Sequence, residues 1–168
     1  DILCDLGCGD GRIVITAAKQ FGTCGTGFDL NPKRIEESKA NAKKANVANN
    51  VQFYEQDLFE ADFSKATVLT LYLLERVNLQ LRPRILNELA PGTRVVSHDF
   101  SMKDWKPDST ETISVDCNTH TVYMWHVPAN IQGNWDLNIS NQYGNKNLTL
   151  KLEQKFQKIN GKVLFAGK

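Results

Sequence analysis

The sequence predicts an α/β fold in which a mainly parallel β-sheet carries helices on both faces. From Ile2 to about Val127, short apolar runs alternate with segments of helical periodicity, the order that builds such a sheet. Beyond Pro128 only strand-like alternation remains. The chain is therefore expected to divide into one domain over residues 1–128 and a small, incomplete β-rich appendage over residues 129–168.

The first expected strand, residues 2–6, runs into a loop of sequence DLGCGDGR, residues 5–12. Glycine takes positive φ freely and lets backbone N–H groups approach a ligand, so the loop predicts a binding site. Its Gly-x-Gly-x-Gly spacing differs from the Gly-x-Gly-x-x-Gly fingerprint of dinucleotide binding. A carboxylate at Asp5 would repel a pyrophosphate and attract an ammonium group. S-adenosylmethionine, which carries an ammonium group, therefore fits the loop.

Two further acidic residues end expected strands. Asp29 closes the second strand, residues 25–29, and lies 18 positions beyond Gly11. This is near the distance of about 20 positions at which an acidic side chain meets ribose hydroxyls. Asp57 follows the third strand, residues 51–56, within expected reach of an adenine amino group. Taken singly, each aspartate is as well explained by a helix cap or turn, but together with the glycine loop they predict one cofactor edge.

Helical periodicity predicts three helices among these strands, over residues 11–21, 32–46 and 78–89. Asn31 is expected to cap the second helix, because a proline follows at its first position. A Pro-Gly pair ends the third helix. The residues expected to face the sheet from the first helix are Ile13, Ala17, Ala18 and Phe21.

The fourth and fifth strands are expected over residues 67–72 and 94–98. Residues 111–115 and 121–127 then alternate and predict an antiparallel hairpin at the sheet edge, with a turn at residues 118–119. The appended strands are expected over residues 135–139, 148–153 and 161–165. Three strands share little core, so the appendage is expected to be cut short or to pair with another chain.

The composition excludes several classes of protein. With 20 basic and 19 acidic residues, the formal net charge is +1, without the cationic excess of a general nucleic-acid binder. No apolar run of 18 residues and no signal-peptide pattern is found, so a cytoplasmic protein without a membrane partner is expected. Because the first strand opens at residue 2, an N-terminal covering segment is expected to be absent. The cysteines, expected to be reduced and buried, are Cys4, Cys8, Cys24 and Cys117.

The strand-end motifs DLGCGDGR, FDLNP and QDLF occur in order at residues 5–12, 28–32 and 56–59. They resemble the first three motifs of class I S-adenosylmethionine-dependent methyltransferases, which implies a Rossmann-like seven-strand sheet. Similarity over roughly residues 1–128 narrows the family to small seven-strand protein-lysine methyltransferases of archaeal and mitochondrial type. The segments that narrow it are TLYLLERVN (70–78), GTRVVSHDF (92–100) and HTVYMW (120–125).

The resemblance implies a role for each motif residue. Asp5 and the loop glycines would hold the methionine end of S-adenosylmethionine, Asp29 the ribose and Asp57 the adenine. Tyr72, at the tip of the fourth strand, would border the transferred methyl group. The full set of implied cofactor contacts is Asp5, Gly7, Cys8, Gly9, Gly11, Asp29, Leu30, Asp57, Leu58 and Tyr72.

Methyl transfer from a sulfonium is an in-line displacement, so the protein's main task is to position an unprotonated amine. Tyr72 and Glu75 are the candidate catalytic residues, because either can accept a hydrogen bond from that amine. The alternatives are strand-end packing for Tyr72 and a surface position opening the next helix for Glu75. His98 is expected only to hydrogen-bond neighbouring loops. His120 and His126 lack an acidic partner at ligand spacing, so no metal site is expected.

Three functions remain open from the sequence. The leading one is methylation of accessible lysines on a protein partner, as the resemblance implies. A class I methyltransferase acting on RNA or a small molecule is the second, although the Asn-Pro-Pro-Tyr tetrad common in base-amino methyltransferases does not follow the fourth strand. A non-catalytic S-adenosylmethionine-binding module is the third.

Overall fold

The structure is a computed structural model that describes residues 1–115, 117–141 and 144–165. The chain forms two compact units, Asp1–Val127 and Pro128–Lys168. Within the described residues, no helix is both long and apolar enough to cross a lipid bilayer.

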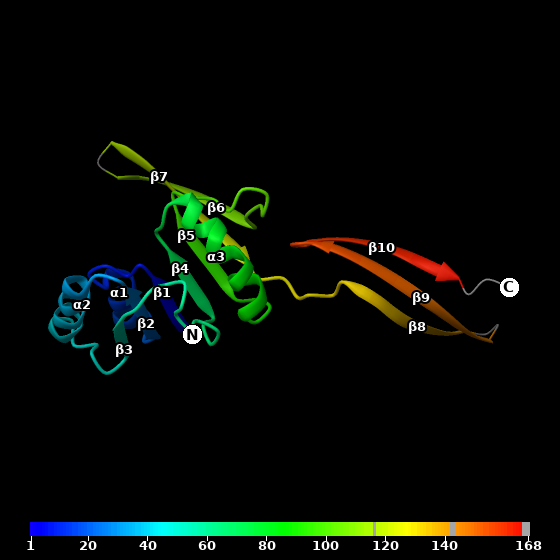
Figure 1. Ribbon diagram of the computed structural model, residues 1–168, viewed down its shortest axis with the longest axis horizontal. Helices are drawn as coiled ribbons and strands as arrows, with labels where there is room; N and C mark the ends of the chain where they lie inside the picture. The colour runs from blue at the N-terminus through cyan, green and yellow to red at the C-terminus, as the bar shows by residue number, and fades with distance from the viewer. Residues whose placement is uncertain (116, 142–143, 166–168) are drawn as a thin grey trace. The chain divides into compact units, whose positions relative to one another are not determined.

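The first unit contains a seven-stranded sheet in the order β3-β2-β1-β4-β5-β7-β6, with β6 and β7 antiparallel to their neighbours and the other strands parallel (Figure 1). This confirms the predicted fold class. The strands are β1 (Ile2–Leu6), β2 (Cys24–Asp29), β3 (Val51–Glu55), β4 (Val68–Leu71), β5 (Arg94–His98), β6 (Ser109–Val115) and β7 (Asn118–His126). The helices are α1 (Arg12–Phe21), α2 (Pro32–Lys44) and α3 (Glu75–Glu88).

The strand order reverses between β1 and β4, which pair in parallel at the centre of the sheet. Right-handed crossovers running outward from this point in both directions place α1 and α2 on one face and α3 on the other. Ligands of open α/β sheets bind at the carboxyl ends of the strands beside such a reversal. The expected glycine loop follows β1 and lies at this position.

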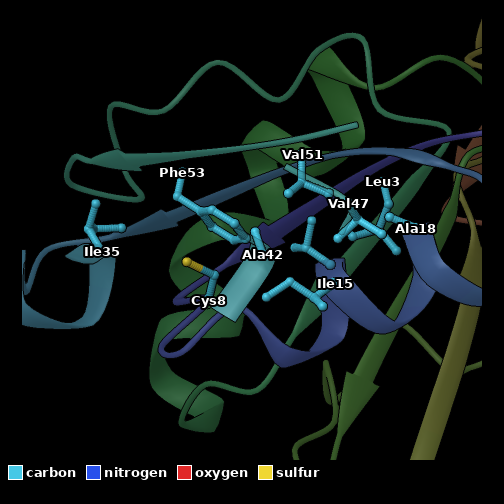
Figure 2. Close-up of a cluster of buried hydrophobic side chains, with 10 residues drawn as sticks. Leu3, Cys8, Ile15, Ala18, Ile35, Ala42, Val47, Val51 and Phe53 are labelled. Atoms are coloured by element: carbon cyan, nitrogen blue, oxygen red, sulfur yellow. The ribbon is translucent and has the colours of Figure 1, made fainter. Parts of the chain in front are cut away.

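A buried apolar cluster fills the space between the sheet and the helices α1 and α2 (Figure 2). Its members are Leu3, Cys8, Val14, Ile15, Ala18, Ile35, Ala42, Val47, Val51 and Phe53. The glycine loop is thus attached to the core through Cys8, which lies in the loop and in the cluster at once.

The expected sheet-facing side of α1 is partly wrong. Ile13 and Phe21 are 37% and 76% exposed, and Val14 is fully buried in their place. The cause is the absent side chain at Gly25 in β2, since Val14 occupies the space that a Cβ there would need. Periodicity alone cannot show which side of a helix meets such a gap.

Two element boundaries in this unit also differ from expectation. The helix α3 begins at Glu75 rather than Asn78, because an acidic residue suits the first turn of a helix. Asn118 and Thr119 are not in a turn, because Asn118 already pairs with Val115 and extends β7. Residues 118–119 therefore belong to the hairpin's second strand.

The second unit is an antiparallel three-stranded sheet of β8 (Gly133–Asn141), β9 (Gly144–Lys155) and β10 (Lys158–Phe165), with β9 in the centre. The third strand starts three residues before the expected Gly161. Trp135, Leu150 and Val163 form one row across the three strands, and the first and last remain about half exposed.

The four cysteines are free, and they are not all buried. Cys4 and Cys8 are buried, as expected, in β1 and in the glycine loop. Cys24 and Cys117 are exposed, because they lie at the first residue of β2 and beside the hairpin turn.

Candidate cofactor and acceptor site

The loop after β1 is held against β2 by its own backbone. The N–H groups of Gly7 and Cys8 both donate to the carbonyl oxygen of Phe28, at 2.8 and 2.9 Å, and Gly11 donates to the carbonyl oxygen of Cys8 at 2.9 Å. Gly7, Gly9 and Gly11 have φ values of 78°, 54° and 78°. Residues that carry a side chain rarely adopt this left-handed backbone conformation. The three alternate glycines therefore make the loop conformation possible.

Gly11 and Gly9 differ in how closely other atoms approach them. A Cβ at Gly11 would lie 2.7 Å from Cζ of Phe53 and 2.9 Å from Cβ of Ser38, so Gly11 is packed against the core. A Cβ at Gly9 would meet nothing within 4 Å. Gly9 is therefore the glycine whose backbone is open to a ligand.

Asp5 is a carboxylate almost entirely removed from water, with 2% of its surface exposed. The hydroxyl of Thr70 in β4 donates to Oδ1 of Asp5 at 2.6 Å, and among the described residues no cationic side chain forms an ion pair with it. Burial raises the pKa of Asp5 to about 6, the hydrogen bond from Thr70 opposes the rise, and repulsion from Asp29 adds to it. A buried carboxylate without a cationic partner attracts a cationic group such as an ammonium, which is the role that the sequence predicts for Asp5.

Asp29, at the end of β2, ties the loop to the neighbouring strand. Its Oδ2 accepts the N–H of Gly9 at 2.9 Å, and its Oδ1 accepts the N–H of Asn31 at 2.8 Å. Asp57 lies two residues after β3, where its Oδ1 accepts the N–H of Phe59 at 2.9 Å. The three predicted aspartates thus follow three adjacent strands at one edge of the sheet.

A cavity of about 320 Å³ opens at this edge. Its lining residues are Asp5, Gly7, Cys8, Gly9, Asp10, Arg12, Ile13, Arg34 and Tyr72. The structure therefore brings five of the ten sequence-predicted cofactor contacts together in one cavity. The other five do not line it: they are the packed Gly11 and, along the ends of β2 and β3, Asp29, Leu30, Asp57 and Leu58.

Tyr72 connects this cavity to a second group of polar side chains. It directly follows β4 and is 56% exposed. Its ring meets the ring of His98 edge-on, with centroids 4.2 Å apart, and His98 stacks on His120 at 4.8 Å. Tyr72 therefore stands between the cofactor cavity and a histidine pair.

The expectation that the hairpin histidines lack acidic partners is wrong. Nδ1 of His120 lies 2.8 Å from Oδ2 of Asp99, and Nδ1 of His126 lies 3.2 Å from Oδ2 of Asp108. Pairing of β5 with β7 brings Asp99 to His120, and pairing of β6 with β7 brings Asp108 to His126, which spacing along the chain does not reveal. Potential ligand atoms of His98, Asp99 and His120 all lie within 4.8 Å of one another.

Glu75 occupies the first position of α3, as the alternative interpretation of this residue proposed. Its Oε1 lies 2.8 Å from Nζ of Lys103, and its Oε2 accepts a hydrogen bond from the hydroxyl of Ser101 at 3.3 Å. The ion pair with Lys103 occupies the carboxylate that would have to meet an acceptor amine.

Besides the cavity-lining residues Asp10, Arg12, Ile13 and Arg34, sequence reasoning missed two polar residues of this region, Thr70 and Asp99. Nothing in the sequence marks Thr70, because its partner Asp5 is 65 positions away. Asp99 was detectable, since it directly follows a strand, as Asp5, Asp29 and Asp57 end or follow theirs. The same rule applied to β5 would have selected it.

Comparison with known proteins agrees with this geometry. A model of the ANTKMT methyltransferase domain matches residues 5–109. A protein-lysine N-methyltransferase of Saccharolobus islandicus is 45% identical over 126 residues, 74% of this chain and 78% of the relative. The adenine nucleotide translocase lysine N-methyltransferase of Mus musculus is 31% identical over 103 residues, 61% of this chain; the match spans less than half of that relative's length, 45%.

A solved structure is similar as well. The crystal structure of an RNA methyltransferase from Salinibacter ruber, in complex with S-adenosyl-L-homocysteine, is 51% identical with a TM-score of 0.72. The alignment covers 78% of this chain and 83% of that one. S-adenosyl-L-homocysteine is what remains of S-adenosylmethionine after its methyl group has been transferred.

A Rossmann-like sheet, a glycine loop after β1 and acidic residues at three strand ends define a class I S-adenosylmethionine-dependent methyltransferase. Within that class, the chain belongs to the ANTKMT methyltransferase domain family and is of the protein-lysine methyltransferase type. The buried carboxylate of Asp5 and the open backbone at Gly9 fit the ammonium-bearing end of this methyl donor.

Replacing Asp29 by alanine is expected to weaken S-adenosylmethionine binding by about 1–3 kcal/mol. The substitution removes both the acceptor for the Gly9 N–H and the expected partner of the ribose hydroxyls. Calorimetric titration measures the change, with Asp62→Ala as the control, because Asp62 is an exposed carboxylate bonded to Ser64. Equal affinity of Asp29→Ala and wild type would contradict the assignment.

Proposed function

We propose that this methyltransferase transfers the methyl group of S-adenosylmethionine to the side-chain amine of a lysine on a partner protein. The observation that carries the proposal is the 45% identity to a protein-lysine N-methyltransferase over 126 residues. The family match, residues 5–109, includes the glycine loop, the strand-end aspartates and Tyr72. A long, flexible lysine side chain suits a site whose bordering residue, Tyr72, is more than half exposed.

The proposed cofactor contacts follow the strand ends. Asp5 and the backbone of the glycine loop hold the methionine end, and Asp29 holds the ribose. Asp57 meets the adenine amino group, with two flanking apolar residues, Leu30 and Leu58, against the ring. Leu30 is 69% exposed, which leaves its side chain free to cover a ligand.

The chemistry requires little of the protein beyond positioning and proton removal. S-adenosylmethionine supplies an activated methyl group. A lysine ammonium has an ordinary pKa of about 10.4 and must lose a proton before its nitrogen can react. Desolvation near the cationic sulfonium favours the neutral amine, and the Tyr72 hydroxyl can accept a hydrogen bond from it. Glu75 contributes less, because Lys103 neutralises its charge.

A second candidate acceptor is RNA, which the similarity to the Salinibacter ruber RNA methyltransferase favours. The distribution of charge in this chain argues against it. Residues 128–168 hold six lysines and two acidic residues, a net charge of +4, which leaves −3 for residues 1–127. A methyltransferase unit with net negative charge is poorly suited to a phosphate backbone.

Incubation with methyl-labelled S-adenosylmethionine and a desalted cell extract tests the proposal. Protein, nucleic acid and small molecules are separated before counting, with extract alone as the blank. Label on lysine residues of the protein fraction is the expected result. Label confined to RNA or to small molecules would replace the proposal with the second candidate, and binding without turnover on any fraction would indicate a non-catalytic module.

We further propose a reducing compartment, such as the cytoplasm, as the site of action. Four free cysteines, two of them exposed, support this proposal. Exposed thiols persist best where glutathione and thioredoxin keep them reduced.

A further inference from the structure

Asp99 is a carboxylate fixed from three directions where β5 ends. Its Oδ2 lies 2.8 Å from Nδ1 of His120 and 3.4 Å from Nδ1 of His98, and its Oδ1 accepts the N–H of Thr121 at 2.8 Å. Asp99 has a φ of 61°. Aspartate is among the few residues other than glycine that adopt this left-handed region readily, and here three contacts hold it there.

The ring of His98 lies beside this carboxylate. Its Nδ1 is buried 3.4 Å from Oδ2 of Asp99 and has no hydrogen-bond partner among the described residues, while 31% of the side chain is exposed. The rings of His98 and Tyr72 meet at 87°, and Tyr72 lines the cofactor cavity. His98 thus places an imidazole next to the residue that borders the candidate methyl-transfer site.

We propose that His98 is a catalytic residue that accepts the proton of the acceptor ammonium, with Asp99 and His120 as positioning residues. The inference rests on the proposed function, methyl transfer to a lysine amine. In general-base histidines a carboxylate faces Nδ1 and leaves Nε2 to act as the base. We expect the 3.4 Å contact between Nδ1 of His98 and Asp99 to tighten into that hydrogen bond when the acceptor binds. This assigns His98 a role beyond the loop contacts expected from sequence.

In the proposed step, Nε2 of neutral His98 takes one proton from the lysine ammonium, which becomes a neutral amine. The amine nitrogen then bonds to the methyl carbon as the carbon–sulfur bond breaks and its electron pair stays on sulfur. Protonated His98 finally releases the proton to water, and the methylated amine carries the positive charge.

The same three side chains also suggest a metal site. The 3.4 Å between Nδ1 of His98 and Oδ2 of Asp99 fits that interpretation, and the distance from Asp99 to His120 does not. Zinc bound at about 2.0–2.1 Å holds tetrahedral ligands roughly 3.4 Å apart. The 2.8 Å between Oδ2 of Asp99 and Nδ1 of His120 is a hydrogen-bond distance. That hydrogen bond is the largest of the effects that lower the pKa of Asp99. The lowered pKa keeps the carboxylate ionised.

The titratable groups around His98 come from three elements. Tyr72 contacts it from the end of β4, Asp99 from the following residue and His120 from β7. Two further charged groups, Lys103 after β5 and Glu75 at the start of α3, form an ion pair with each other.

The activity test compares wild type, His98→Asn and His126→Asn in the labelled-extract assay at pH 7 and pH 10. His126 is the matched control, since it lies on the same hairpin and also faces an aspartate, Asp108. At pH 7, His98→Asn should methylate protein lysine about 100-fold more slowly than wild type, because a general base commonly contributes a rate factor of this size. At pH 10 the difference should shrink to less than about tenfold, because a lysine of pKa about 10.4 is then substantially deprotonated by solvent. His126→Asn should match wild type at both pH values.

A second measurement does not depend on turnover. Nitrogen chemical shifts of labelled histidine should show that neutral His98 carries its proton on Nδ1, facing Asp99, and that Asp99→Asn changes this tautomer. A proton on Nε2 in the wild type would overturn the proposal. Calorimetric titration of His98→Asn with S-adenosylmethionine should give wild-type affinity, which shows that the variant is folded.

The outcomes separate the two proposals. A wild type that labels no protein lysine ends the proposed function. If wild type labels lysine and His98→Asn does so equally at both pH values, only the role of His98 is overturned. Loss of wild-type activity in EDTA with recovery in zinc would also overturn it, in favour of a metal site.

Discussion

Replacing Asp5 by asparagine should stabilise the free protein at neutral pH and nearly abolish cofactor binding. The carboxylate is buried, accepts a hydrogen bond from Thr70 and has a pKa raised to about 6. Asparagine keeps the shape and the acceptor for Thr70 but carries no charge to desolvate. It also offers nothing to offset the positive charge of an ammonium group, so we expect S-adenosylmethionine to bind at least about 100-fold more weakly.

The pH dependence of stability follows from the direction of the Asp5 pKa shift. Because the pKa rises from 3.8 to about 6 on folding, the folded protein holds this proton more tightly than the unfolded chain does. The contribution of Asp5 to stability is therefore greatest below about pH 4 and falls as the pH rises through 6, by about 3 kcal/mol for a shift of this size. Since the amide of asparagine also has a desolvation cost, we expect Asp5→Asn to gain about 1–3 kcal/mol over wild type at pH 7.5 and little at pH 4.

Urea unfolding of both proteins from pH 4 to pH 8 measures the stability difference, and calorimetric titration measures the affinity. Asp62→Asn is the control, because hydrogen bonds from Ser64 lower the pKa of Asp62 and its loss should reduce stability slightly. An Asp5→Asn variant no more stable than wild type at pH 7.5 would show that the buried charge of Asp5 does not destabilise the folded protein. Undiminished affinity would refute the ammonium contact.

Alanine at Gly11 and alanine at Gly9 should have opposite consequences, although both glycines lie in one loop at positive φ. At Gly11 the new Cβ meets Phe53 and Ser38 within 3 Å, so strain and overpacking should together cost about 2–5 kcal/mol of stability. At Gly9 the Cβ meets nothing, so only the backbone strain of about 1 kcal/mol remains. That Cβ projects into the space where the cofactor is expected, so affinity should fall at least about tenfold.

Thermal unfolding without cofactor separates the two variants. Gly11→Ala should melt well below wild type, whereas Gly9→Ala should melt within a few degrees of it and bind S-adenosylmethionine poorly. Equal melting temperatures would mean that the loop relaxes around the methyl group added at Gly11 in solution. Undiminished affinity of Gly9→Ala would place the cofactor elsewhere along the loop.

Much of this architecture could be predicted because its signals are local. The glycine loop, with Gly7 and Gly9, can be identified from neighbouring residues alone. The strands that end near Asp5, Asp29 and Asp57 are likewise short apolar runs with polar ends. The rule that parallel strands end at one edge then places the three aspartates together. The cofactor side of the site follows from this rule alone.

What could not be predicted depends on contacts between distant segments. Ile13 satisfies the helical period as well as Val14 does, and only the gap at Gly25 decides which is buried. His120 meets Asp99 through the register of β5 against β7, which fixes partners 21 positions apart. The acceptor side of the site therefore emerges only from the folded chain.

Cys8 lines the candidate cofactor cavity, and its sulfur packs beside Gly27 of β2, where a Cβ would lie 2.8 Å from it. Burial, together with the nearby carboxylates of Asp5 and Asp29, raises the pKa of this thiol to about 12. Only about one molecule in 10⁵ then carries the reactive thiolate at pH 7. The aspartates expected to recruit the methyl donor therefore also disfavour the thiolate of a cysteine in the same loop.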